Sequence, residues 1–373
     1  MVPPVDEELG DEELVDEELV MVRQTVRSLL EATCGVGRAD DGVEWRGLWG
    51  TITRAGWTGI GLPPGDTRQG LGASGVVALF EEAGRYLVPA PLLSTAGLFV
   101  PLVAGAGGDA AVDLLEPAVR DGRPAGIALP PDDRLDAPAD AGARWDGQTL
   151  SASGFLVMDA DRIELVAVPA TGPDGEPVVA VVDMGTAGLE MLPCRGADPD
   201  RPLARMDLQA ELEPRWIVGA DPARGFEGAV LAVAAELVGI AQRCLELSAR
   251  HAMERVQFGR PIGSFQSIKH RLADDAVATE EARSLVRAAA QAVDAMDGAG
   301  ARGRWRSVSM AKAAASEAAT NAAASAVQVH GALAMSWDHP IHRHLRRAWL
   351  DSALLGGPTQ HYQSVAESLM GQR

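Results

Sequence analysis

The chain has 373 residues, of which 47% are hydrophobic and 23% are charged. This composition is typical of a folded globular protein with roughly two or three domains, and it excludes a disordered chain. The 52 acidic residues outnumber the 33 basic ones, which gives a net charge of −19. Such a charge repels nucleic-acid backbones and anionic membranes, so neither is an expected partner.

Part of this acidity is concentrated near the N-terminus. A DEEL motif repeats every five residues across positions 6–19 and contributes nine acids. We interpret this segment as a solvated leader, with an acidic interaction arm as the alternative. It has neither the basic nor the apolar region of a secretory signal, and the chain's three cysteines are far apart in sequence. Both features predict a cytoplasmic protein.

The first third of the chain, residues 1–123, is predicted to be a helical domain. Apolar residues recur at helical spacing over Val20–Leu30 and Val76–Leu87. Residues 86–108 carry no charge, but Pro89, Pro91 and Pro101 interrupt them. We therefore expect a buried hairpin in this stretch and no membrane span.

The middle of the chain, residues 124–218, is predicted to be a β-barrel or β-sheet domain. Short runs of β-prone residues alternate there with turn clusters such as TGPDGEP at 171–177. The expected strands are Ala125–Leu129, Thr149–Ser151, Gly154–Met158, Ile163–Pro169, Val178–Met184 and Arg205–Gln209.

The last part, residues 219–373, is predicted to be a four-helix bundle. From Val230 to Leu247 apolar residues follow alternating spacings of three and four, which places them on one face of a helix. Further helices are expected over 265–296 and 305–330 and within 341–369. Short connections between long helices are typical of such bundles.

The most distinctive local pattern is ERVQFGRPIGSFQSIKH at 254–270. It interrupts two helical segments and brings Arg255, Gln257 and Gln266 together around the aromatic Phe258. Arginine binds phosphate through paired hydrogen bonds, so the segment is a candidate anion site. Arginine and glutamine are also ordinary residues at helix ends, and the pattern alone does not choose between these interpretations.

This segment resembles the R-x-x-F-G-x-x-I-x-x-F-Q motif of the acyl-CoA dehydrogenase family. Two other stretches agree with that resemblance. Residues 56–93 are similar to the family's N-terminal helical domain, and QVHGALAM at 328–335 followed by HPIHRHLRRA at 339–348 is similar to its Q-x-x-G-G segment and the next helix. The resemblance covers most of the chain and implies an α+β, three-domain fold of helices, sheet and bundle.

The resemblance also implies an activity. Members of this family are flavoprotein oligomers in which a glutamate removes the α-proton of an acyl-CoA and FAD accepts the β-hydride. Their FAD site is shared between subunits, and the bundle motifs hold the dinucleotide of the neighbouring subunit. Carried over by position, the cofactor-binding residues are Arg255, Gln257, Phe258, Gln266, Gln328, His330 and Gly331. One departure is Ala332, which replaces the second glycine and adds a methyl group to a close backbone approach.

The flavin-ring half of the site departs further from the family pattern. Where the family has T-E-P-x-x-G-S-D, this chain has ALPPDDR at 128–134. The family's base lies in Y-E-G-T, but here DSALLGGPT at 351–359 places Leu355 or Gly356 at that position. Some relatives carry the base on the first bundle helix, near Ala229 here. Asp351 and Glu227 are the acids closest to these two positions and are the weaker candidates for a relocated base.

Half a flavin site without a base resembles the divergent subunits of heteromeric acyl-CoA dehydrogenases from actinobacterial steroid side-chain degradation. The resemblance implies an α2β2 assembly with one FAD per heterodimer, in which a second dehydrogenase subunit supplies the base. An electron-transfer flavoprotein is the implied electron acceptor. Two alternatives stay open: a self-sufficient homotetramer with a relocated base, and a non-catalytic scaffold with the same fold.

A cluster of histidines near the C-terminus invites a metal-site interpretation. His339, His342 and His344 lie close together, but no carboxylate or thiol pattern accompanies them. Arg343, Arg346 and Arg347 share the segment. We expect a solvated or interface face on this helix and no metal.

Overall fold

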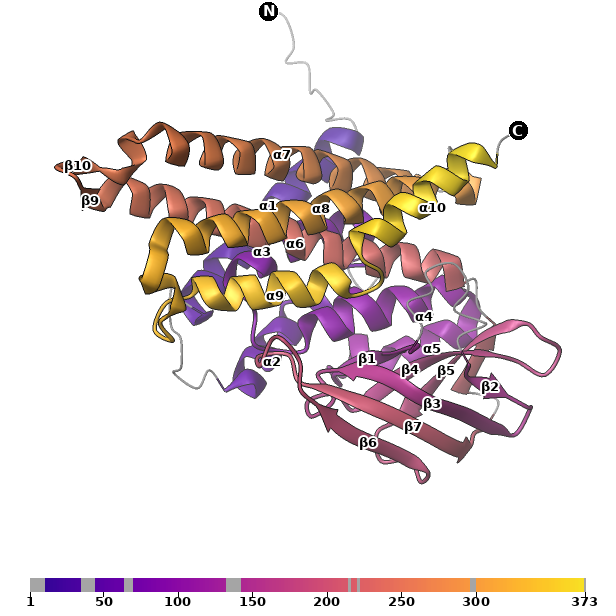
Figure 1. Cartoon of the computed structure of the whole chain (residues 1–373). Helices are drawn as coiled ribbons and strands as arrows, with labels where there is room; N and C mark the ends of the chain where they lie inside the picture. The colour runs from indigo at the N-terminus through magenta and orange to yellow at the C-terminus, as the bar shows by residue number, and fades with distance from the viewer. Residues whose placement is uncertain are drawn as a thin grey trace, which may run out of the picture.

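The computed structural model describes residues 11–34, 44–63, 70–131, 142–213, 216–219, 222–295 and 300–371. Helices from both ends of the chain pack against one another, and the sheet from its middle lies along one side of them (Figure 1). The long helices α6, α7 and α8 run side by side. The expected order of helices, sheet and bundle is confirmed.

The N-terminal region is helical, as predicted. Its elements are α1 (Asp11–Cys34), α2 (Trp45–Arg54), η1 (Trp57–Gly59), α3 (Gly72–Tyr86), η2 (Leu93–Phe99), α4 (Val100–Ala106) and α5 (Gly108–Val119). Residues 11–19 of the acidic leader belong to α1, and residues 6–10 lie outside the described part of the chain.

The expected hairpin within residues 86–108 is wrong. From Leu93 to Ala106 the chain is one continuous helical segment, and every residue of Leu93–Phe99 is buried. Pro101 lies just after the junction of η2 and α4, and the helical segment continues through it.

The sheet has eight strands among the described residues, in the order β6-β7-β3-β1-β4-β5-β8, with β2 beside β3 and β4. Their bounds are β1 Ala125–Leu129, β2 Arg144–Trp145, β3 Thr149–Met158, β4 Leu165–Thr171, β5 Pro177–Asp183, β6 Leu189–Cys194, β7 Leu203–Glu211 and β8 Ile217–Gly219. One face of the sheet forms its own core around Phe155 and Met206, and the other packs Ile127 and Val181 against the helices.

Most predicted strands are present, but two of them are joined into one, and the short strands β2 and β8 and the longer β6 were not predicted. The expected Thr149–Ser151 and Gly154–Met158 are one strand, β3, whose register shifts between Ser153 and Phe155. Strand β6 was not predicted. It lies at the edge of the sheet and its residues are half-buried or exposed, so no apolar alternation marks it in the sequence.

The C-terminal helices are α6 (Pro222–Glu254), α7 (Gln266–Asp294), α8 (Gly300–His330), η6 (Gly331–Met335), α9 (Ile341–Ala353) and α10 (Pro358–Met370). The fourth predicted helix is therefore two, α9 and α10. The chain turns sharply between them because Leu355 and Gly356 have φ angles of 56° and 95°. Helix α6 is long and apolar enough to cross a membrane, but 83% of its apolar window is buried in the bundle.

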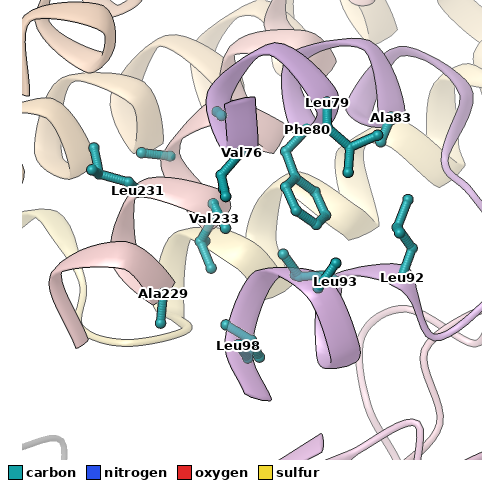
Figure 2. Close-up of a cluster of buried hydrophobic side chains, with 14 of the residues drawn as sticks. Val76, Leu79, Phe80, Ala83, Leu92, Leu93, Leu98, Ala229, Leu231 and Val233 are labelled. Carbon is teal, nitrogen blue, oxygen red and sulfur yellow. The ribbon is translucent and has the colours of Figure 1, made fainter. Parts of the chain in front are cut away.

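Apolar side chains of α3, η2 and α6 interlock at the centre of the molecule (Figure 2). Phe80 lies between Val76 and Leu93, and Ala229 of α6 lies near Leu98. A methyl group added at Gly97 would collide with the side chains of Leu93 and Phe80, so the helices approach closely there. This packing encloses the position of Ala229 in hydrocarbon.

Candidate functional site

The ERVQFG segment forms a small hairpin at one end of the bundle. Strands β9 (Val256–Gln257) and β10 (Arg260–Pro261) project from the end of α6, and η5 (Ile262–Ser264) leads into α7 (Figure 1). The Arg255 N–H donates to the carbonyl of His251 at 2.8 Å. Phe258 has a φ angle of 56° and is 92% exposed. The hairpin therefore presents an aromatic ring to the outside at the cost of backbone strain.

The second motif lies at the end of α8. Gln328 and Gly331 are exposed. Gly331 has a φ angle of 60°, and a methyl group there would meet no neighbouring atom. His330 is buried, and its ring stacks on His251 of α6 with centroids 4.3 Å apart. The stack joins the two motifs across the bundle, so the structure brings the predicted residues to one end of it.

This end has the chemistry needed for part of a dinucleotide. Arg255, Gln257, Gln266 and Gln328 are exposed cations and amides that can donate to a diphosphate. Phe258 offers an exposed ring for stacking, and the open backbone at Gly331 allows close approach. The donor set fits FAD.

The opposite half of a flavin site has fewer donors in this chain. Strand β1 ends at Leu129, and Pro130 and Pro131 follow it. Proline has no N–H, so this turn lacks two backbone donors. Residues 132–134 of the predicted departure lie outside the described residues.

The turn predicted to correspond to the family's base position contains no carboxylate. Residues 354–357 are Leu-Leu-Gly-Gly, between α9 and α10. Lys312 of α8 is fully buried and donates to the carbonyls of Ser352 and Gly356, both at 3.1 Å, and to Ser316 Oγ at 3.0 Å. Burial lowers the pKa of Lys312 to about 7, against the opposing effect of Asp351.

His361 of α10 completes this turn from the other side. Its Nε2 donates to the carbonyl of Leu355 at 3.0 Å, and its Nδ1 has no partner. Burial, together with the nearby Lys312, lowers the pKa of His361 to about 4, against the opposing hydrogen bond to Leu355. Sequence reasoning missed both residues because neither belongs to a motif: Lys312 is 44 positions from Gly356, and only the fold turns the nearby His361 back onto Leu355.

The alternative base position, near Ala229 on α6, also lacks a free carboxylate. Ala229 is buried among the apolar side chains of Figure 2. Glu227 is 1% exposed and accepts a hydrogen bond from Arg304 Nε at 3.1 Å. Its carboxylate is thus committed to an ion pair with α8.

Asp351 belongs to a buried ionic cluster. Its Oδ1 accepts from Arg201 at 2.5 Å, and Arg201 also binds both carboxylate oxygens of Glu236, at 2.6 and 2.7 Å. Arg347 pairs with Asp198 and lies 3.4 Å from Glu236. These five residues form what we call the Arg201 cluster, and each is less than 6% exposed.

The pKa of Asp351 is strongly perturbed within the Arg201 cluster, first by burial and then by the neighbouring charges. Burial raises the pKa of Asp351 to about 7; Arg201 opposes that rise and Glu236 reinforces it. Its Oδ2 has no partner. The carboxyl group is therefore a structural element between the segment before β7 and helices α6 and α9. Nothing in the sequence pairs Arg201 with Asp351, which lie 150 positions apart.

The expected solvated face of residues 339–347 is wrong in part. His342, His344 and Arg347 are buried. His344 is held between the carbonyls of Pro340 and Arg85, at 2.9 and 3.3 Å, because α9 packs inward against the N-terminal helices. Within the described residues, no group of three or more His, Cys, Asp or Glu side chains could hold a metal ion.

Comparison with known proteins agrees with this geometry. Residues 223–370 match the family model described as the acyl-CoA dehydrogenase C-terminal domain. The chain is 33% identical over 353 residues to acyl-CoA dehydrogenase IpdE2 of Mycobacterium tuberculosis, covering 91% of this chain and 93% of that protein. The chain belongs to the acyl-CoA dehydrogenase family. Over 347 residues it is also 30% identical to FadE34 of the same organism, covering 90% of this chain and 44% of that longer protein.

Two solved structures extend this family relationship. The ChsE4–ChsE5 complex of M. tuberculosis contains a chain that superposes with a TM-score of 0.83 at 24% identity, covering 96% of this family member and 98% of that chain. A variant of the Tcur3481–Tcur3483 steroid acyl-CoA dehydrogenase gives a TM-score of 0.81 at 27% identity, covering 96% and 99%. The predicted family and fold are confirmed.

Proposed function

We propose that this chain is the base-lacking subunit of a heteromeric, FAD-dependent acyl-CoA dehydrogenase that desaturates an acyl-CoA between its α and β carbons. It completes the FAD site of a second dehydrogenase subunit in an α2β2 assembly. The observation that carries this proposal is the contrast between two places in one chain: a donor-rich bundle end and a base position without a carboxylate.

Catalysis of α-proton removal needs a base beside the substrate. A positioned general base contributes roughly 10²–10⁴ in rate. At the 354–357 turn this chain instead has the buried Lys312. The two candidate acids, Asp351 near this turn and Glu227 near Ala229, are both ion-paired to arginine. A carboxylate that is already neutralised and enclosed is a poor acceptor for a substrate proton. The partner subunit would therefore supply the base.

The donor-rich end supports a role at FAD. When bound, FAD supplies hydride acceptance. In this chain Arg255 and Gln328 would hold the diphosphate and Phe258 would pack against a ring of the cofactor. These side chains point outward from the chain, so they serve a site that a second subunit closes.

A partner also accounts for the exposed apolar side chains at this end. Phe258, Met253, Val256, Met335 and Trp337 are all more than half exposed. Grouped apolar exposure of this kind marks protein interfaces. The heteromeric complexes among the structural neighbours support a second dehydrogenase subunit as the partner, and a steroid side-chain thioester as the substrate class. An electron-transfer flavoprotein would accept the electrons, and the complex would work in the cytoplasm.

The deciding experiment measures the flavin-to-protein ratio and the native mass of the chain alone and with a co-expressed partner dehydrogenase. We expect a colourless chain that gains flavin only in the complex. A ratio near one in a tetramer of this chain alone would refute the proposal in favour of the homotetramer. Lack of flavin with every partner would favour the scaffold.

Substitution separates the same hypotheses. Arg255→Ala should remove flavin from the complex while both chains stay folded, and Arg120→Ala, at a 75% exposed side chain far from the hairpin, serves as the control. Glu227→Gln should leave turnover of the complex almost unchanged. Abolished turnover would instead identify Glu227 as a relocated base.

A further inference from the structure

Three histidines from three different elements form a stack beside the two cofactor motifs. His251 lies in the last turn of α6, His330 ends α8, and His339 precedes α9. The rings of His251 and His330 are nearly parallel, with an angle of 25° between them. His339 lies 4.8 Å from His330, centroid to centroid, at 56°. The middle ring is 8% exposed, so it is covered on both sides by its neighbours.

Contacts with the backbone determine whether the Nδ1 atom of two of these rings carries a proton. His330 Nδ1 lies 2.8 Å from the carbonyl oxygen of Ala326, which can only accept, so Nδ1 carries the proton. His339 Nδ1 accepts the N–H of Ile341 at the start of α9, at 3.4 Å, so this nitrogen is unprotonated. The observed contacts therefore require a neutral His339.

Charges around the stack disfavour protonation. Burial lowers the pKa of His251, and His330 and Arg255 lower it further against the opposing Glu254. Burial also lowers the pKa of His330. The hydrogen bond from His330 to the Ala326 carbonyl opposes that effect.

The same holds at the outer ring of the stack. Burial lowers the pKa of His339, and the two other stacked rings and His342 lower it further. His342 in turn faces Arg346 and Arg343 on α9, with Asp200 opposing them. At neutral pH the stack is therefore uncharged and held by ring packing.

The stack is connected to both cofactor motifs. The carbonyl of His251 accepts the N–H of Arg255, and the Arg255 carbonyl accepts the N–H of Ile262 at 2.8 Å, which closes the hairpin. On the other side His330 directly precedes Gly331, two residues after Gln328. A shift of either ring would move one motif relative to the other.

We infer that the His251–His330–His339 stack positions Arg255 and Gln328 toward one diphosphate, and that its protonation in acid separates them. His251 and His339 are positioning residues in this scheme, because they act through the two motifs. The inference rests on the proposed function for the identity of the diphosphate. The stack itself can be tested without any cofactor.

The first test uses hydrogen exchange on the chain alone, comparing wild type with His251→Phe and His251→Ala. Phenylalanine keeps a ring on His330 but cannot take up a proton, whereas alanine removes the ring. We expect wild-type protection of the Arg255 and Ile262 amides to fall below pH 6.5, by up to about tenfold per pH unit for each proton taken up. The same two amides should lose less protection in acid in the His251→Phe variant. In the His251→Ala variant they should be unprotected at every pH.

Circular dichroism and native mass confirm that each variant is folded. If alanine prevents folding, the phenylalanine variant carries the test. Protection in His251→Phe that falls with pH as in wild type would overturn the inference. So would wild-type protection in a folded His251→Ala.

The second test measures FAD retention by the complex between pH 7.5 and 5.5. We expect wild type to release FAD in acid, His251→Phe to release less, and His251→Ala to bind weakly throughout. A complex that never binds FAD would refute the proposed function, while the exchange data would still report on the stack. Equal retention by all three proteins would refute the positioning role alone.

Discussion

Arg201 is the residue whose removal should reveal how the sheet is attached to the bundle. Its guanidinium donates to Asp351 of α9 and to both oxygens of Glu236 of α6, from the segment just before β7. Methionine fills a similar volume but provides no charge. Arg201→Met therefore leaves two buried carboxylates without their principal cation, and Arg347 is the only arginine that remains in the Arg201 cluster.

The expected loss of stability follows from that geometry. Removing one partner of a buried ion pair typically costs about 3–5 kcal/mol. At about 2.1 cal/mol/K per residue, the unfolding entropy of 373 residues is roughly 0.8 kcal/mol/K, so Tm should fall by about 4–6 °C. The loss should shrink in acid, because protonation of Asp351, whose pKa burial raises to about 7, removes one of the two unpaired charges.

Differential scanning calorimetry between pH 5 and 8 measures this change. The control is Arg120→Met, which removes an exposed i,i+4 pair with Glu116 and should cost less than about 1 kcal/mol. A Tm within 1 °C of wild type for Arg201→Met, or a loss that grows in acid, would show that the Arg201 cluster does not work as an ion-paired joint.

Three further predictions concern groups whose burial sets their behaviour. Folding raises the pKa of Asp351 from 3.8 to about 7, so the folded chain holds a proton that the unfolded chain has lost between those values. Stability should therefore fall as pH rises through that window, with the unfolding equilibrium constant increasing by up to about tenfold per pH unit. Calorimetry of Asp351→Asn should show no such pH dependence. Lys312 has the opposite sign, because folding lowers its pKa from 10.5 to about 7 and stability should rise with pH between them. Lys312→Met should abolish that rise and speed hydrogen exchange at residues 354–357; unchanged exchange would contradict its role in holding the turn. Ala229→Glu should lower Tm by several degrees, since it buries an unpaired carboxylate in hydrocarbon, and a Tm equal to that of Ala229→Ser would refute the enclosed position.

The sequence determined the secondary structure wherever one face of an element is buried. The apolar spacing from Val230 to Leu247 predicted a core helix, and the β-prone runs predicted most strands of the sheet. Both predictions succeed because an element with one buried face needs apolar residues at the period of that element. The edge strand β6, the short strands β2 and β8, and the break between α9 and α10 were missed. An exposed strand such as β6 has no periodic apolar residues. The α9–α10 break depends on a positive φ angle at Leu355, which the identity of this residue does not predict.

The sequence also determined the family and the residues placed at the bundle end, since both depend on short motifs that are continuous in the chain. Tertiary structure alone decided what the isolated titratable residues do. Asp351 was a candidate base by its position, but the fold encloses it with Arg201, 150 residues away. Lys312 entered no motif, yet it holds the turn at the base position, and His251 was an ordinary helix-end residue until the fold placed His330 against it. The physical reason is the same in each case: burial and a distant partner set the charge of these groups, and neither is encoded in local sequence.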